Sequence, residues 1–239
     1  MYLTPTSLHW ACDIEADNYL DLATTIWCIT VVNIVTKEKV SFTDADSFNN
    51  WYHPSYILVG HNFLAYDLPM LNRHYGTHIP ATSVVDTFVL SQLYEPTLGQ
   101  HNLKNWGLRL GYPKAEFNDF SHYSPEMLRY CFRDAMLAGL LYVRLSERMR
   151  NVGFTELGCE IEHLAWSLIQ NKQRKNGFPF DKQRGEELYV TLRSREEELK
   201  DEIHKLWPPK LEVVRRYKSG GHSLWISSFN SSSLDLRVT

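Results

Sequence analysis

The feature that most constrains the fold is a short predicted strand that ends in two acidic residues. Apolar side chains recur at every second position from Leu8 to Ile14, which is the period of a β-strand. Asp13 and Glu15 are two residues apart, so they point to the same side of the strand. Two carboxylates this close repel each other unless a shared proton or a divalent cation lies between them. Because the same triplet also occurs at solvated strand ends, its function depends on partners elsewhere in the chain.

The order of the other elements predicts an α/β fold with a mixed sheet. Residues 24–36 are rich in β-branched and aromatic side chains, and with residues 40–42 they predict an antiparallel meander. A short helix capped by Thr43 or Asp44 follows. Residues 56–60 form a continuous apolar run, which is typical of a strand buried on both faces. Further elements are predicted at residues 66–75 (helix), 83–85 (strand), 86–93 (helix) and 103–110 (helix).

A long helix is predicted from Ser124 to about Arg150, with a cap, a proline and an acid in its first turn. Helices are predicted at residues 155–175 and 181–206, and we expect them to form a separate appendage. Residues 227–233 are almost all serine and asparagine, which predicts a loosely ordered tail. The predicted domains are therefore residues 1–152, a helical segment at 153–207, and a poorly ordered or truncated tail at 208–239.

Composition excludes several classes of protein. The 239 residues carry a net charge of −3, which does not by itself indicate nucleic-acid binding. The four cysteines form no C-x-x-C pair, which argues against a zinc site or a disulfide scaffold and favours buried reduced thiols. We see no signal peptide in the first ten residues and no apolar run long enough to span a bilayer. We therefore expect a soluble, cytoplasmic protein without a membrane partner.

Two further acids are candidates to join Asp13 and Glu15. Asp67 follows the buried strand at a predicted helix start, where binding sites form in α/β sheets but where a plain N-terminal acid is also common. Asp134 and Tyr130 are four residues apart on the long helix and share a face beside its apolar stripe. An acid in that position needs a cation or a salt bridge to a neighbouring arginine such as Arg129 or Arg133.

Four carboxylates suit hard cations, because Mg²⁺ and Mn²⁺ prefer oxygen ligands. Two ions about 3.5–4 Å apart are the usual arrangement for cleaving phosphodiesters. Asp86, at a strand-to-helix junction, is interpreted instead as a helix cap. The sequence thus predicts a site for two Mg²⁺ or Mn²⁺ ions.

The spacing of these residues resembles the three motifs of the 3′→5′ proofreading exonuclease domain of family A DNA polymerases. The D-x-E motif falls on Asp13 and Glu15, and the third motif falls on Tyr130 and Asp134 in the form of the tyrosine subtype. The second motif falls on Asn62, Tyr66 and Asp67. Residues 86–91, 101–107 and 176–181 further resemble polymerases of short-tailed bacteriophages, in which the last segment opens the thumb subdomain. The resemblance covers residues 8 to about 207.

The resemblance implies an RNase H-like fold and a metal-dependent nuclease that releases nucleoside 5′-monophosphates from single-stranded DNA 3′ ends. It assigns one ion to Asp13, Glu15 and Asp134, and the other to Asp13 with Asp67. Tyr130 would orient the attacking water, and Asn62 would support the site. Phe63, Leu64 and Tyr66 are candidates to contact the DNA end, although core packing is an alternative for them.

No segment of residues 208–239 resembles the palm and fingers that form the nucleotidyl-transfer site of that family. A split or truncated polymerase would explain this, with primer–template duplex and a separate polymerase chain as further partners. Two other interpretations stay open. One is an RNA 3′-exonuclease similar to RNase D, which uses the same acids, and the other is an inactive exonuclease-like scaffold for a polymerase.

Overall fold

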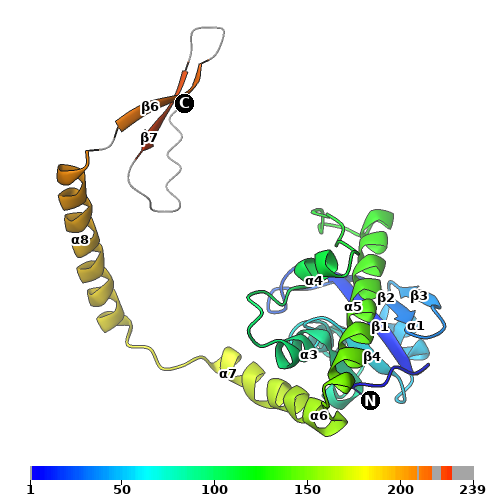
Figure 1. The fold of residues 1–239 in the computed structure, drawn as a ribbon. Coiled ribbons are helices and arrows are strands. Elements are labelled where there is room, and N and C mark those ends of the chain that lie inside the picture. The colour runs from blue at the N-terminus through cyan, green and yellow to red at the C-terminus, as the bar shows by residue number, and fades with distance from the viewer. Residues whose placement is uncertain (1, 209, 217–221, 228–239) are drawn as a thin grey trace. The chain divides into compact units, whose positions relative to one another are not determined.

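The structure is a computed structural model that describes residues 2–208, 210–216 and 222–227. The chain forms two compact units, Met1–Gly177 and Phe178–Thr239 (Figure 1). The first unit contains a five-stranded sheet covered by helices, and the second contains a long helix and a β-hairpin. The sequence placed the first boundary at residue 152, whereas in the structure the helical segments up to residue 176 belong to the first unit.

The sheet of the first unit is mixed, and the acidic strand lies at its centre. The strands span His9–Ala16 (β1), Ile26–Asn33 (β2), Lys39–Phe42 (β3), Ile57–Gly60 (β4) and Val84–Asp86 (β5). Their order in the sheet is β3-β2-β1-β4-β5. β1, β2 and β3 form the predicted antiparallel meander, whereas β1 pairs in parallel with β4 and β4 with β5.

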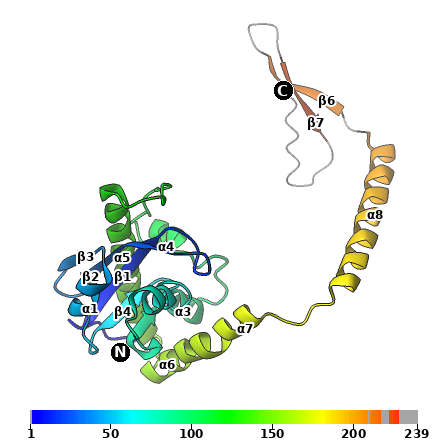
Figure 2. The ribbon, with the colours of Figure 1, turned by 180° about the vertical axis from the view of Figure 1, so that it is seen from behind.

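Helices cover both faces of this sheet. α5 (Pro125–Asn151) lies across one face and α1 (Ala45–Trp51) lies on the other, as the opposite views in Figures 1 and 2 show. Trp10 of β1 packs in the core on the α1 side, whereas Ala11 packs in the core under α5. Because side chains alternate along a strand, the acids at the odd positions after Ala11 also face α5.

Several helices begin at the caps that the sequence predicts. Asp44 caps α1 and Ser124 caps α5, each by accepting a hydrogen bond from a backbone N–H in the first turn. The predicted helix at residues 66–75 is instead α2 (Asp67–Met70) followed by a π-helical turn, η1 (Leu71–Tyr75). The other helical segments of the first unit are η2 (Ala81–Ser83), α3 (Thr87–Tyr94), α4 (Leu103–Arg109), α6 (Glu156–Ala165), η3 (Trp166–Gln170) and α7 (Asn171–Asn176).

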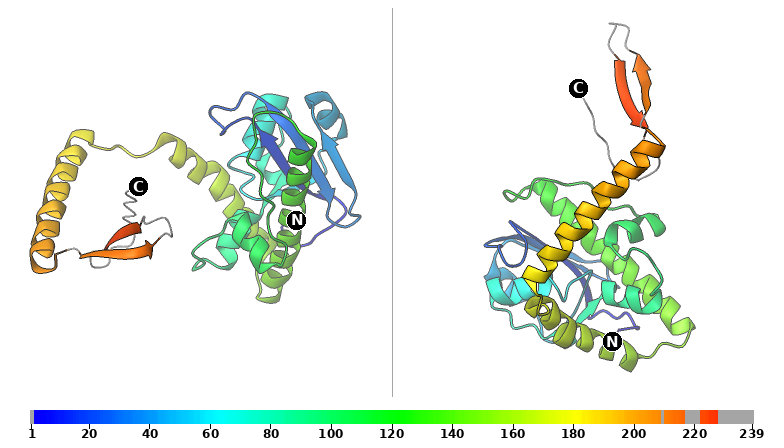
Figure 3. Two further views of the ribbon diagram at one scale, coloured as in Figure 1. Left: turned by 90° about the horizontal axis from the view of Figure 1, so that it is seen from above. Right: turned by 90° about the vertical axis from the view of Figure 1, so that its left-hand side faces the viewer.

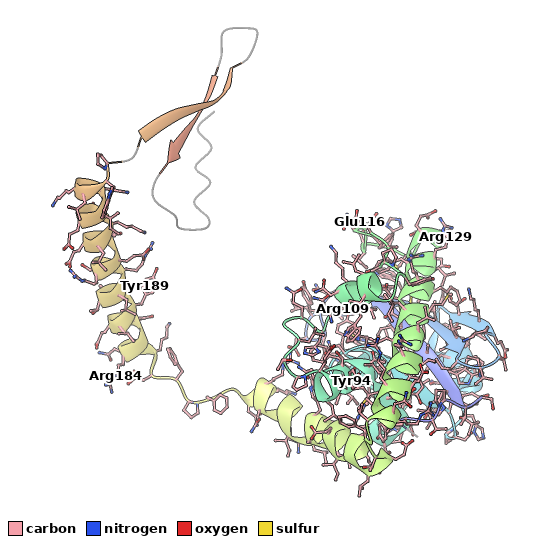
Figure 4. All side chains as sticks on the ribbon, in the orientation of Figure 1. Tyr94, Arg109, Glu116, Arg129, Arg184 and Tyr189 are labelled. Atoms are coloured by element: carbon pink, nitrogen blue, oxygen red, sulfur yellow. The ribbon has the colours of Figure 1, made fainter. Side chains whose placement is uncertain are left out.

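The second unit contains α8 (Lys182–Leu206) and the antiparallel hairpin of β6 (Lys210–Arg216) and β7 (His222–Ser227), which both views of Figure 3 show. The two strands lie in the range for which the sequence predicted a poorly ordered tail, and residues 209, 217–221 and 228–239 of that range lie outside the described residues. α8 buries none of its residues, and Figure 4 shows its side chains, Arg184 and Tyr189 among them, projecting from the helix. Among the described residues, no helix has the length and apolar character needed to cross a membrane.

A close approach at Gly60 fixes the turn after β4. A Cβ atom at this position would overlap Cδ2 of Phe63, and the ring of Phe63 is fully buried. We therefore expect Gly60→Ala to lower the free energy of unfolding by about 1–3 kcal/mol, the usual cost of overpacking a core. Thermal unfolding measures this loss, with Gly99→Ala as the control because that position has open space around it. Equal melting temperatures for Gly60→Ala and the wild type would contradict this account of the turn.

Candidate active site

Asp13 and Glu15 lie near the carboxyl end of β1 on the face toward α5. Asp13 is partly exposed, whereas Glu15 is 8% exposed. The pairing of β1 with β2 becomes irregular between Glu15 and Ala16, directly after the second acid. Because β1 and β4 are parallel, their carboxyl ends meet at one edge of the sheet, and the loop after β4 therefore begins beside the two acids.

Asp86 holds the loop after β4 in place. Its carboxylate accepts hydrogen bonds from the backbone N–H groups of Asn62 (2.8 Å), Leu64 (3.0 Å) and Phe88 (2.9 Å). The bond from Phe88 caps α3, as predicted, and the other two fix the loop. Asn62 adopts a left-handed backbone conformation (φ +64°), which asparagine tolerates better than most residues. The loop leads to Asp67, the first residue of α2, which is only 6% exposed.

Asp86 is itself supported by a histidine from α6. The backbone N–H of Asp86 donates to Nε2 of His163 (2.9 Å), and Nδ1 of His163 lies 2.7 Å from the carbonyl oxygen of Cys159. These partners require the neutral ring with its proton on Nδ1. Burial favours the same form by lowering the pKa of His163 to about 4. A helix that the sequence assigned to the appendage therefore supports the loop of the site.

Tyr130 and Asp134 lie one turn apart on α5, as their spacing predicts. The ring of Tyr130 packs against Phe117 and Phe120, with centroid distances of 5.4 and 6.2 Å. Burial raises the pKa of the Tyr130 hydroxyl to about 12, and the carboxylate of Asp134 acts in the same direction. Tyr130 therefore remains a neutral phenol at physiological pH.

Asp134 pairs with a residue that the sequence did not single out. Nζ of Lys114 lies 2.6 Å from Oδ2 of Asp134. The two arginines proposed as partners are engaged elsewhere, because Arg129 forms an exposed ion pair on α5 and Arg133 stacks on the ring of Tyr112. The other oxygen of Asp134, Oδ1, is buried and has no hydrogen-bond partner among the described residues.

These side chains line one pocket of about 200 Å³. β1, α2 and α5 deliver the four acids predicted from the sequence to this pocket, and Lys114 is the one lysine or arginine among its described lining residues. The lining is formed by Asp13, Ile14, Glu15, His61, Asn62, Tyr66, Asp67, Lys114, Tyr130 and Asp134.

Burial raises the pKa of all four carboxyl groups. The pKa rises to about 8 for Asp13 and to about 10 for Glu15, because nearby carboxylates add their repulsion to the effect of burial. The pKa values of Asp67 and Asp134 are raised as well, in both cases mainly by burial. The positive charge of Lys114 acts in the other direction and lowers the pKa values of Asp13, Glu15 and Asp134. Without a bound cation these acids therefore tend to retain protons near neutral pH, and the single ammonium group of Lys114 does not offset their mutual repulsion.

Cys131 also lies close to the acids, with its sulfur within 4.8 Å of carboxylate oxygens of Asp13 and Glu15. Its thiol contacts the backbone oxygen of Asp13 (3.3 Å) and the hydroxyl of Thr30 (3.2 Å). Burial raises the pKa of this thiol well above its ordinary value, so it stays protonated. A neutral thiol is a poor ligand for hard cations, and Cys131 is therefore a packing residue here. All four cysteines are buried and free, as predicted.

Of the three residues proposed to contact the DNA end, two lie in the core and only Tyr66 lies in the pocket. Phe63 and Leu64 are buried in the core on the α1 side (0% and 2% exposed), so neither presents a surface to a ligand. Tyr66 lines the pocket, but its hydroxyl donates to the backbone oxygen of Asn18 (2.6 Å) and ties two loops together. Stacking on a base needs an exposed ring, so the structure corrects the assignment of Phe63 and Leu64 to DNA binding.

The chain is similar in sequence to bacteriophage replication enzymes. It is 32% identical to the DNA-directed DNA polymerase of Escherichia phage T7 and 31% identical to that of Enterobacteria phage T3. Each alignment covers 60% of this chain and 28% of the relative. The resemblance to the exonuclease domain of phage DNA polymerases is confirmed. The chain spans less than a third of the length of these two polymerases. No model of a protein family matches it.

Solved structures show the same fold. Brucella melitensis NrnC superposes with a TM-score of 0.57 at 16% identity, over 74% of this chain and 88% of NrnC. A structure of NrnC with bound Mg²⁺ gives a TM-score of 0.58 at 16% identity, over 76% of this chain and 92% of that chain. The first unit therefore has an RNase H-like α/β fold.

Proposed function

We propose that the first unit is a metal-dependent 3′→5′ DNA exonuclease that releases nucleoside 5′-monophosphates from single-stranded 3′ ends. The observation that carries this proposal is the convergence of Asp13, Glu15, Asp67 and Asp134 on one pocket beside Tyr130. The sequence similarity to phage DNA polymerases supports DNA as the substrate. The fold shared with NrnC supports a nuclease.

The side chains present fit two Mg²⁺ or Mn²⁺ ions. Carboxylate oxygens are the ligands that these hard cations prefer. The unpaired, buried Oδ1 of Asp134 lacks the partner that a buried carboxylate oxygen requires. Asp13, Glu15 and Asp134 would hold one ion, and Asp13 with Asp67 would hold the other. When bound, such a pair of ions activates water as a nucleophile and stabilises the leaving oxygen.

The residues of the chain itself would position the reactants. Hydrolysis joins a water oxygen to the terminal phosphorus, breaks the bond from phosphorus to the 3′-oxygen, and leaves a proton on that 3′-oxygen. Tyr130, a neutral phenol one turn from Asp134, can orient the attacking water through a hydrogen bond without ionising. Asn62 and Tyr66 would form another wall of the site. The backbone N–H of Asn62 donates to the carboxylate of Asp86, and the hydroxyl of Tyr66 donates to the backbone oxygen of Asn18, so both residues are held in place.

Trimming of a 5′-labelled single-stranded DNA oligonucleotide tests the proposal. We expect a ladder of shortened products and free nucleoside 5′-monophosphates with Mg²⁺ or Mn²⁺, and no products in EDTA. An RNA oligonucleotide of the same sequence tests the RNase D-like alternative, because faster cleavage of RNA would transfer the proposal to that substrate. If the chain trims neither substrate with either ion, the exonuclease proposal fails and the scaffold interpretation replaces it.

We further propose that this activity proofreads for a polymerase. The relatives at 31–32% identity are DNA polymerases, of which this chain spans 28%. The polymerase would be supplied either by further sequence in the same protein or by a separate chain that binds primer–template duplex. Co-expression with the product of the neighbouring gene, followed by purification through this chain, tests the second arrangement. A polymerase that elutes independently of this chain would contradict it.

A further inference from the structure

Lys114 contacts two of the five residues proposed for catalysis. Its ammonium nitrogen lies 2.6 Å from Oδ2 of Asp134 and 5.0 Å from the centroid of the Tyr130 ring. The Asp134 side chain is 3% exposed, whereas that of Lys114 is 29% exposed. A partly exposed ammonium group therefore contacts a buried carboxylate in the lining of the pocket that holds the four acids.

The backbone of Lys114 is fixed, although it lies in the loop between α4 and α5. A Cβ atom on Gly107 of α4 would lie 2.7 Å from the carbonyl oxygen of Tyr112 and 3.2 Å from the backbone nitrogen of Lys114, so the loop packs directly on this helix. Nε of Arg133, next to Asp134 on α5, donates to the carbonyl oxygen of Pro113 (2.8 Å). Figure 4 shows the continuation of the loop at Glu116 beside the first turns of α5, near Arg129. The packing of this loop on α4 and α5 therefore holds the backbone of Lys114 beside Asp134.

A lysine on Oδ2 of Asp134 and a divalent ion on Oδ1 of the same carboxylate repel each other. Both are cations that seek the same carboxylate, and their mutual repulsion in a partly desolvated pocket is strong. The backbone is anchored, but the four-carbon stem of lysine is flexible enough to carry the ammonium group away. Binding of a metal at Asp134 therefore weakens its contact with Lys114, and the lysine in turn weakens the binding of the metal.

We propose that Lys114 is a positioning residue that holds Asp134 and Tyr130 in the metal-free site and competes with the divalent ion for Asp134. The proposal rests on the proposed function, since it assumes that Asp134 binds the ion. Lys114 would stabilise the metal-free fold and raise the concentration of ion that the site needs. Removal of Lys114 should therefore lower the stability of the metal-free fold and strengthen metal binding. Removal of a residue with a merely structural role would weaken both.

Titration of the full chain with Mn²⁺, followed by electron paramagnetic resonance of the free ion, tests this without DNA. We expect Lys114→Met to bind Mn²⁺ at least fivefold more tightly than the wild type, which is the lower end of typical coupling between two sites. The same variant should have a lower melting temperature in EDTA, because Asp134 loses its partner. Lys114→Arg should stay close to the wild type in both measurements, and Lys104→Met, at an exposed position of α4, is the matched control.

Adding Asp134→Asn to Lys114→Met should remove the gain in Mn²⁺ affinity, because the contested carboxylate is then absent. Unchanged or weaker Mn²⁺ binding by Lys114→Met would overturn the proposal, and so would a wild-type chain that binds no Mn²⁺. A chain that binds Mn²⁺ but cleaves no nucleic acid would refute the proposed function alone, and the titration would still decide the role of Lys114.

Discussion

Replacing Asp13 with asparagine is expected to slow metal-dependent trimming of DNA by about 10³-fold or more, which corresponds to about 4 kcal/mol of transition-state stabilisation. Asp13 is the acid that the proposal assigns to both ions, so its loss weakens the whole metal site. Asparagine has nearly the same shape, and the change therefore removes a charge without opening a cavity. The rate of product formation from a 5′-labelled single strand at saturating Mg²⁺ measures the effect.

The same variant is expected to be at least as stable as the wild type when metal is absent. In the wild type, burial and the neighbouring carboxylates raise the pKa of Asp13 to about 8. At neutral pH the folded protein must therefore either hold an unfavourable charge there or take up a proton. Asparagine does neither, and its amide can donate a hydrogen bond to Glu15. The melting temperature in EDTA measures this gain.

Loss of activity together with retained or increased stability distinguishes a catalytic residue from one that the fold needs. Asp21→Asn is the control, because Asp21 is exposed on the loop after β1 and lies outside the pocket. We expect that control to match the wild type in both rate and melting temperature. A rate for Asp13→Asn within about threefold of the wild type would contradict the assignment of Asp13 to the metal site.

Local periodicity was sufficient to predict much of the site. The period of two in β1 put Asp13 and Glu15 on one face, and the four-residue spacing in α5 put Tyr130 beside Asp134. Both rules depend only on the geometry of one element. The order of strands and helices likewise predicted the mixed sheet, because short connections and buried parallel strands leave few arrangements.

The remaining features depend on contacts between distant segments, for which the sequence carries no local signal. Lys114 precedes its partner by 20 positions and lies in a loop without periodicity. The hydrogen bonds that Asp86 accepts from the loop after β4 and donates to His163 of α6 span 22 to 77 residues. The burial of Phe63 follows from the close approach at Gly60, which depends on how the chain turns after β4. An apolar residue beside a motif can therefore pack in the core as readily as it can contact a ligand, and the sequence does not distinguish the two.

The metal-free protein is expected to lose stability as the pH rises from about 7 to about 8.5, and Mg²⁺ is expected to reverse this loss. Asp13 and Glu15 have folded-state pKa values of about 8 and 10, far above those of ordinary carboxyl groups. In this range the unfolded chain has released these protons and the folded chain has retained them. Folding then takes up protons, so the free energy of unfolding falls with pH by up to about 1.4 kcal/mol per pH unit for each proton.

We expect this fall in the free energy of unfolding with rising pH only above about pH 6.5. Below that pH, two buried histidines make the free energy of unfolding rise with pH. Burial lowers the pKa of His61 to about 3 and that of His163 to about 4, so below the ordinary histidine pKa the unfolded chain binds more protons at these positions. Their contribution makes the protein more stable as the pH rises toward about 6.5, and it then levels off. Measurements at pH 7 and above therefore isolate the carboxyl groups from the histidines.

Melting temperatures in EDTA and in millimolar Mg²⁺ test the expectation. In a domain of this size 1 kcal/mol shifts the melting temperature by about 2–4 °C, so each proton taken up should lower it by about 3–6 °C per pH unit in EDTA. Mg²⁺ binds the deprotonated carboxylates, so the increase it causes should grow with pH. Asp13→Asn should show a shallower slope in EDTA and a smaller response to Mg²⁺. A melting temperature in EDTA that stays constant or rises from pH 7 to 8.5 would show that the four acids are not held together as the pocket requires.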